Sequence, residues 1–157
     1  MYTETFFCHP QLEWSQKKTN CVVATISGTL FFVGWWFMID VGAVYPHIVN
    51  FNKVYYVPGV CATVSFVVVN SIPLSAMKGS YYYDWTRCAR VTIILVMFVG
   101  LVATFGTLIA SAYILINDFL LGPPTIDLWP GWAMFLQNFL IASSSLLIKF
   151  GTKREEI

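Results

Sequence analysis

One carboxylate and two carboxamides stand inside apolar runs that are long enough to cross a membrane. Asp40 lies in the first of these runs, and Gln137 and Asn138 lie in the last. An aspartate at the centre of a transmembrane helix costs about 2.5–3.5 kcal/mol, so it needs a hydrogen-bond donor or a functional reason to be there. If these two runs cross in opposite directions, Asp40 lies roughly 7–8 Å and the carboxamides roughly 10–12 Å from the same membrane surface. The sequence therefore predicts a buried polar layer, in which Gln137 or Asn138 donates a hydrogen bond to Asp40.

Two roles are open for this polar layer. Asp40 could be part of a proton or cation path, or it could hold helices together. Transporters usually place several ionisable groups at depth, whereas the apolar runs contain Asp40 alone. This difference favours the structural role.

Catalytic and metal-binding patterns are missing from the sequence. His9 and His47 have no second histidine, cysteine or carboxylate at ligand spacing. No nucleophile, base and orienting group can be assembled, and there is no glycine-rich phosphate loop. We therefore expect a protein that is not an enzyme and that has no metal or cofactor.

The composition indicates the elements that must position these residues. Of the 157 residues, 57% are hydrophobic and only 11% are charged, and the net charge of +1 gives no basic excess for nucleic acid. Apolar runs that approach the 20 residues needed to span a bilayer cover residues 21–45, 57–77, 91–116 and 130–148. The sequence predicts an all-α polytopic membrane protein, with four transmembrane helices in one bundle over residues 21–149.

Lysine and arginine indicate the orientation of this bundle. Only Lys53 falls on one face, and eight of the nine basic residues fall on the other. Such an excess is typical of the cytosolic side. We therefore expect both termini in the cytosol, with residues 1–20 as an amphipathic surface arm or a loose tail and residues 150–157 as a short tail. The eight residues are Lys17, Lys18, Lys78, Arg87, Arg90, Lys149, Lys153 and Arg154.

The cysteines do not predict a disulfide framework, because none falls in an exterior loop of this topology. Cys8, Cys21 and Cys88 lie near the predicted cytosolic interface, and Cys61 lies in the second run. Palmitoylation of the first three and plain reduced thiols are both open, and reduced thiols are favoured.

Pro73 interrupts the second apolar run. Because proline lacks an N–H group, the carbonyl of Val69, four residues earlier, loses its helical partner. We expect a kink at this point.

Small and aromatic residues predict where the helices touch one another or a partner. Small residues recur at spacings of three and four in the third run, which favours close helix packing. Trp35 and Trp36 lie near the middle of the first run rather than at an interface, so at least one should pack against a helix or a partner protein, with a lipid pocket as the alternative. The candidate contact residues are Gly34, Trp35, Trp36, Gly100, Ala103, Thr107 and Ala110.

The first run also carries a family pattern. It reads Leu30-Phe31-Phe32, Gly34-Trp35-Trp36, Met38-Ile39-Asp40 and Val44-Tyr45-Pro46, and this order resembles the signature of the transmembrane protein 50 family, whose fungal relative is vacuolar protein sorting protein 68. The resemblance continues along nearly the whole chain. Further matches are Trp14-Ser15, Lys17-Lys18, Asn20, Ala89-Arg90-Val91, Phe105-Gly106, Leu108-Ile109-Ala110-Ser111, Pro130-Gly131, Gln137-Asn138 and Lys149-Phe150-Gly151.

The resemblance implies a four-helix protein of endoplasmic reticulum, Golgi and endosomal membranes, linked in fungi to sorting from late endosomes to the vacuole. It implies as partner a four-span protein of the leptin receptor overlapping transcript and vacuolar protein sorting protein 55 family. We therefore expect a non-enzymatic protein that assists assembly, sorting or trafficking of other integral membrane proteins, including as an accessory subunit, in contact with membrane lipids. A small proton- or ion-coupled transporter that uses Asp40 and a lipid-binding membrane protein remain the alternatives.

Overall fold

All regular structure in the described part of the chain is helical. The computed structural model describes residues 10–45, 53–72, 87–123 and 127–152. Four stretches in it are long and apolar enough to cross a membrane, and this confirms the predicted all-α membrane fold. The elements are α1 (Pro10–Val44), the 3-10 turn η1 (Lys53–Tyr56), α2 (Val57–Ser71), α4 (Arg87–Ile114), the π-helical turn η2 (Leu115–Leu120) and α5 (Trp129–Gly151).

Some predicted features fall at or beyond the limits of the described ranges. Residues 10–20 of the predicted arm continue α1 as helix, and residues 1–9 lie outside the description. α2 ends at Ser71, so the kink expected at Pro73 also lies outside the described residues.

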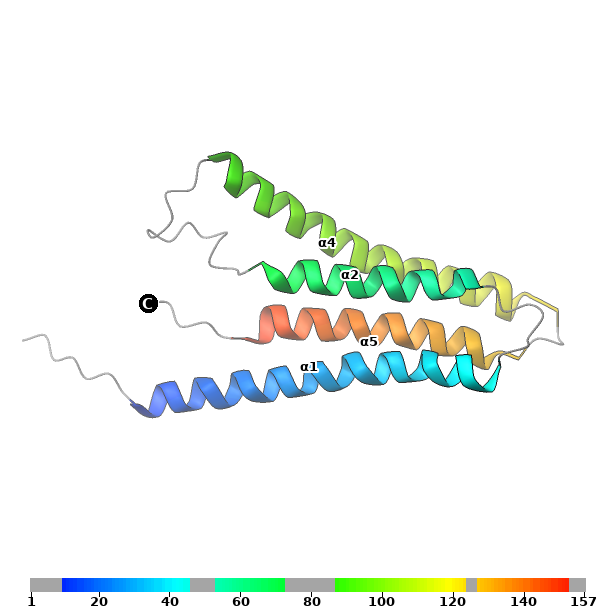
Figure 1. The fold of residues 1–157 in the computed structure, drawn as a ribbon, viewed down its shortest axis with the longest axis horizontal. Coiled ribbons are helices and arrows are strands. Elements are labelled where there is room, and N and C mark those ends of the chain that lie inside the picture. The colour runs from blue at the N-terminus through cyan, green and yellow to red at the C-terminus, as the bar shows by residue number, and fades with distance from the viewer. Residues whose placement is uncertain (1–9, 46–52, 73–86, 124–126, 153–157) are drawn as a thin grey trace, which may run out of the picture.

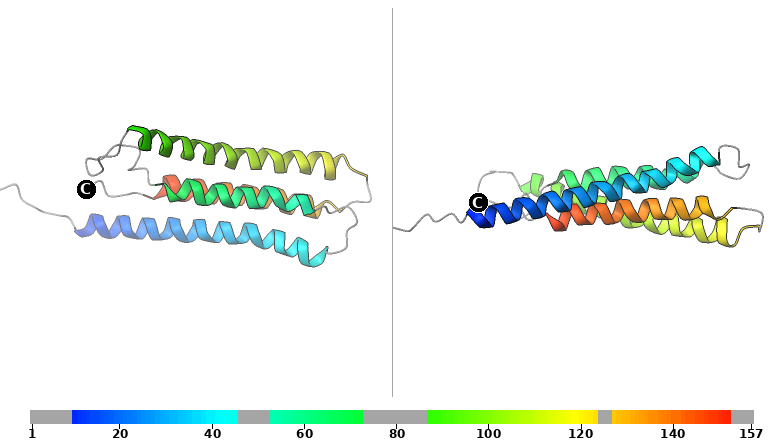
Figure 2. Two further views of the ribbon diagram at one scale, coloured as in Figure 1. Left: turned by 45° about the horizontal axis from the view of Figure 1, so that its top comes forward. Right: turned by 90° about the horizontal axis from the view of Figure 1, so that it is seen from below.

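Helix α5 lies at the centre of the bundle. Among the described helices it is the one that packs against α1, α2 and α4, and half of its membrane-spanning window is buried. The corresponding buried share is 17% for both α1 and α4. These two helices flank the pair formed by α2 and α5 (Figures 1 and 2). Among the described helices α5 is therefore the one most enclosed by protein, although Phe139 and Phe150 are exposed, and most of the surface of α1 and α4 is left for lipid or a partner.

The contact between α1 and α5 has a seven-residue repeat. Ser27, Gly34 and Val41 of α1 are buried, and so are Gln137 and Ser144 of the antiparallel α5. Gly34 meets Gln137, and Ser27 meets Ser144. A spacing of seven keeps the same face of each helix against the other, and small residues let the backbones approach. This repeat fixes the register of the two helices.

Charged side chains sort to the two ends of the bundle. All four described cationic side chains, Lys17, Lys18, Arg90 and Lys149, belong to the end where α1 begins and α5 ends (Figure 1), which we call the basic end. The described carboxylates belong to the opposite, acidic end, and they are Asp40, Asp118 and Asp127. The positive-inside rule predicts that the basic end faces the cytosol.

Candidate functional site

Helix α5 carries a row of buried polar side chains through the bundle. They are Gln137, Asn138, Ser144, Ser145 and Lys149, and each is at most 6% exposed. We call this row the polar seam. In a membrane a polar group without a partner is unfavourable, so each member of the seam must bind another helix, its own backbone or a ligand.

Ser144 joins the polar seam to α1. The hydroxyl of Ser27 donates to the Ser144 carbonyl, and the hydroxyl of Ser144 donates to the Ser27 carbonyl at 2.8 Å. The two hydroxyl oxygens lie 3.0 Å apart. Both residues are fully buried, so this reciprocal pair links the two helices away from lipid.

Ser145 joins the polar seam to α2. The side-chain amide of Asn70 donates to the Ser145 hydroxyl at 3.2 Å and to the Phe66 carbonyl at 2.9 Å. Ser144 and Ser145, adjacent in the chain, therefore bond to helices on two different sides of α5.

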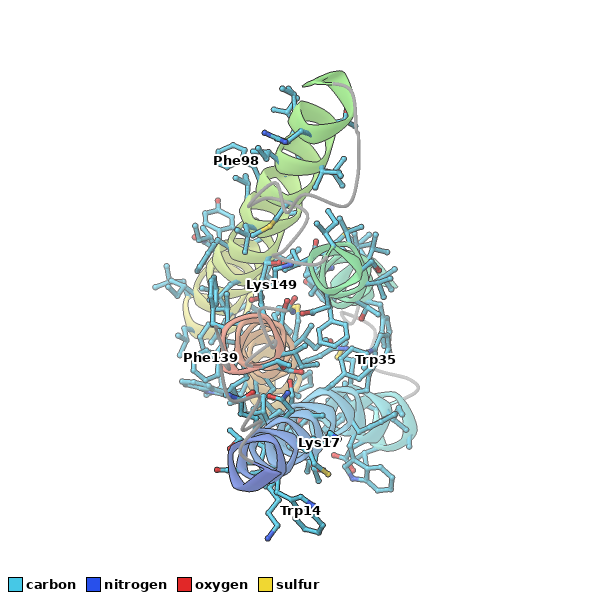
Figure 3. All side chains as sticks on the ribbon, turned by 90° about the vertical axis from the view of Figure 1, so that its left-hand side faces the viewer. Trp14, Lys17, Trp35, Phe98, Phe139 and Lys149 are labelled. Carbon is cyan, nitrogen blue, oxygen red and sulfur yellow. The ribbon has the colours of Figure 1, made fainter. Side chains whose placement is uncertain are left out.

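Lys149 caps the end of α2 from the neighbouring helix. Its ammonium nitrogen donates to the Val69 carbonyl at 2.8 Å and to the Ile72 carbonyl. The last carbonyls of a helix lack intrahelical donors and carry partial negative charge, so a cation is favourable there. The side chain points into the bundle, whereas Trp14 and Phe98 point away from it (Figure 3). The sequence predicted that the Val69 carbonyl lacks its helical partner, but it did not predict which group replaces that partner. In the sequence, Lys149 indicated only where the last apolar run ends.

Gln137 lies between two glycines on two other helices. A Cβ at Gly34 of α1 would lie 3.2 Å from the Gln137 carbonyl oxygen, and a Cβ at Gly59 of α2 would lie 2.7 Å from the side-chain Cδ. The residue is 1% exposed, and neither its Oε1 nor its Nε2 has a hydrogen-bond partner in the described part of the protein. Its carboxamide is therefore packed by shape but not satisfied by hydrogen bonding.

Asp40 does not bind the carboxamides, so the predicted hydrogen bond is wrong. Its Oδ2 accepts from the indole Nε1 of Trp129 at 3.3 Å, and Asn138 donates to the Met134 carbonyl on its own helix. The α1–α5 register explains the difference. Gly34 faces Gln137, so Asp40 lies six residues, about 9 Å, nearer the acidic end.

The structure also places the predicted contact residues. Gly34 packs against α5, and Gly100 packs against Val69 of α2. Trp35 donates to the Thr63 hydroxyl of α2 at 3.2 Å, whereas Trp36 is 70% exposed. On α4, Ala103 and Thr107 are half-buried and Ala110 is exposed.

A second aromatic–carboxylate pair at the acidic end was not predicted. The Tyr55 hydroxyl donates to Asp118 Oδ2 at 3.0 Å, which ties η1 to η2. The π-helical turn also brings Phe119 against Gly131, where an added Cβ would lie 2.6 Å from the ring. No signal in the sequence marks a π-helical turn.

The chemistry of this arrangement is hydrogen bonding between helices. No group of three histidine, cysteine or carboxylate side chains that could hold a metal ion occurs in the described residues. Cys21 and Cys61 are free and exposed, and the side chains of Cys8 and Cys88 lie outside the description. The polar seam can hold α5 in place. It leaves Asn138 Oδ1 and both polar atoms of the Gln137 carboxamide without a partner in the described residues, so Gln137 has the larger capacity to bind a ligand.

Two comparisons identify similar proteins. A model of the family described as "Uncharacterised protein family (UPF0220)" matches residues 3–157. The chain is 33% identical over 152 residues to the "Transmembrane protein 50 homolog" of Dictyostelium discoideum, covering 90% of this chain and 96% of that protein. No solved structure matches the chain. The family model thus covers the entire four-helix bundle.

Proposed function

This chain belongs to the transmembrane protein 50 family, and from that premise we propose that it is a non-enzymatic endomembrane protein that assists assembly, sorting or trafficking of other integral membrane proteins. In this proposal it resides in endoplasmic reticulum, Golgi and endosomal membranes and acts as an accessory subunit of larger membrane complexes. A four-span protein of the leptin receptor overlapping transcript and vacuolar protein sorting protein 55 family is the first partner to test.

The observation that carries the proposal is an exposed stripe on α1, which we call the α1 outer stripe. It consists of Thr25, Thr29, Phe32, Trp36 and Ile39, which alternate at spacings of four and three and are all exposed. Phe32 and Trp36 are 72% and 70% exposed, although the opposite face of α1 is engaged with α5. A stripe at this spacing suits the packing of a further helix, and large rigid aromatic side chains are typical anchors of interfaces.

The packing of the core favours binding over transport. A proton or cation path that used Asp40 would have to continue along the bundle towards Lys149. Between these levels the core contains Met38, Met134 and Ile141, each at most 1% exposed. The polar seam crosses the same levels, but Lys149 is the one ionisable side chain that is buried in the described core. Transporters usually hold several ionisable groups at depth, so this packing supports a role for the outer surface.

Affinity purification of the tagged full chain in mild detergent tests the proposal. We expect integral membrane proteins to co-purify with the wild type and to be lost with the double variant Phe32→Ala/Trp36→Ala. The matched control is Phe98→Ala/Phe105→Ala, which removes two exposed aromatic rings from α4. Equal recovery of partners with both double variants, or only lipid with the wild type, would contradict the proposal.

A further inference from the structure

The interface between α1 and α2 is closed by side chains rather than by backbone packing. The two helices make few close backbone approaches in the described ranges. Two side-chain contacts bridge them: the Trp35 indole on Thr63, and the Phe31 ring 4.9 Å from the Phe66 ring. A third contact comes from η1, directly before α2, where the Tyr56 hydroxyl lies beside Gly42. Figure 3 shows Trp35 between these two helices. An interface that is closed only by side chains can open without movement of either helix, because the side chains need only change rotamer.

The unsatisfied carboxamide of Gln137 lies at the same depth in the bundle as the side chains that close the α1–α2 interface. Thr63, which accepts from Trp35, itself donates to the Gly59 carbonyl at 2.9 Å. Gly59 is the residue against which the Gln137 head group packs. One contact path therefore leads from the half-buried ring of Trp35 through Thr63 and Gly59 to Gln137.

Gln137 differs from its neighbours in the polar seam by having no protein partner on its side chain. Ser144, Ser145 and Lys149 all bond to another helix. Gln137 has two N–H donors and one carbonyl acceptor, and all of them are buried without a partner. An amide in this state is unfavourable by several kcal/mol in hydrocarbon, so a ligand that satisfies it gains affinity.

The depth of Gln137 indicates which ligand could reach it. The residue is eight positions from Trp129, or about 12 Å along α5, and the end at Gly151 is farther away. Phospholipid headgroups stay at the membrane surface, whereas a transmembrane helix can carry an amide or hydroxyl at this depth. The hydrogen-bonding need of Gln137 is thus complementary to a polar side chain within a helix.

We infer that the α1–α2 interface is a docking site for a transmembrane helix of another protein that carries a polar side chain near its centre. Trp35 turns aside, and the polar side chain exchanges hydrogen bonds with the Gln137 carboxamide. The hydrogen bond from the Trp35 indole nitrogen to the Thr63 hydroxyl, which keeps the interface closed, is 3.2 Å long and thus at the long end of the usual range. This inference rests on the proposed function and names the class of membrane protein that it recognises.

Two designed helices test the inference. Each is a single span of leucine and alanine, with either asparagine or leucine at its central position, reconstituted with the labelled full chain in liposomes. Energy transfer between fluorophores on the helix and the chain measures binding. We expect the asparagine helix to bind about three- to twentyfold more tightly than the leucine helix, as for one interhelical hydrogen bond in a membrane.

Variants of the chain test whether the preference for the asparagine helix depends on Gln137 and Trp35. Gln137→Leu should abolish the preference for asparagine, and Gln137→Met repeats this test with a more flexible side chain. Trp35→Phe removes the indole donor and should strengthen binding of the asparagine helix. The control Phe139→Leu changes an exposed ring on the same helix and should preserve the preference. Far-ultraviolet circular dichroism checks that each variant keeps its helices.

The inference fails if the wild type binds both designed helices equally, as it would if buried water or lipid satisfied Gln137. It also fails if Gln137→Leu and Gln137→Met retain the preference. These results leave the proposed function intact when partners still co-purify through the α1 outer stripe. Conversely, a preference that depends on Gln137 supports the inference even if no partner co-purifies, and the two hypotheses are thereby distinguished.

Discussion

The ammonium nitrogen of Lys149 in the last turn of α5 lies 2.8 Å from the carbonyl oxygen of Val69 near the end of α2. The two helices run in the same direction, so the end of one is capped by a side chain from the end of the other. Because Lys149 is 6% exposed, this cation is part of the bundle interior rather than of the surface. It couples the position of α2 to that of the central helix.

Replacement of Lys149 by methionine should therefore destabilise the bundle. The Val69 and Ile72 carbonyls would lose a charged donor, and an unsatisfied buried group costs about 1–3 kcal/mol. Unfolding of the purified protein by denaturing detergent measures the change. Lys17→Met, at an exposed position of the same basic end, should have no comparable effect. A Lys149→Met protein as stable as the wild type would show that the cap is dispensable.

Two glycines of α4 should respond differently to alanine. A Cβ at Gly100 would lie 2.8 Å from a methyl carbon of Val69, which is fully buried, whereas a Cβ at Gly106 would meet nothing within 4 Å. We expect Gly100→Ala to lose about 1–3 kcal/mol of stability through overpacking. Gly106→Ala should be neutral or slightly stabilising, since alanine is the better helix former. Thermal unfolding in micelles compares the pair, and equal effects would contradict the α2–α4 packing.

Ser27 and Ser144 should be energetically coupled. Each hydroxyl bonds to the other residue's carbonyl, so either alanine variant disrupts the same pair. A double-mutant cycle on unfolding free energies should give a coupling of about 0.6–1.7 kcal/mol, the range typical of hydrogen bonds between membrane helices. A second cycle that pairs Ser27→Ala with Ser143→Ala provides the control and should be additive. Additivity in the first cycle would argue against the reciprocal pair.

Asp40→Asn should have little effect on stability. The carboxylate is only partly buried, and an asparagine oxygen can still accept from Trp129, so we expect a change within about 0.5 kcal/mol. The same variant tests the transport alternative through proton flux in proteoliposomes. A flux that is present in the wild type and lost in Asp40→Asn, but retained in Trp129→Phe, would favour that alternative.

The sequence determined the number and nature of the helices. Apolar runs of about 20 residues with few charges leave no other stable arrangement in a bilayer. The basic residues Lys17, Lys18 and Lys149 already indicated which helix ends share a side. The sequence also revealed that the Val69 carbonyl must find a partner outside its own helix, because Pro73 cannot supply an N–H group.

Only the tertiary structure decided which faces meet. It turned Trp35 towards α2 and Trp36 outward, paired Asp40 with Trp129 instead of a carboxamide, and brought Lys149 to the end of α2. In water, hydrophobic periodicity would reveal the inner face of a helix. Lipid is as apolar as a protein core, so periodicity carries little of this information here. The faces are selected instead by small residues that admit a neighbouring backbone and by polar groups that bond to other helices. Both kinds of contact depend on the register between two helices, which the sequence of one helix alone does not specify.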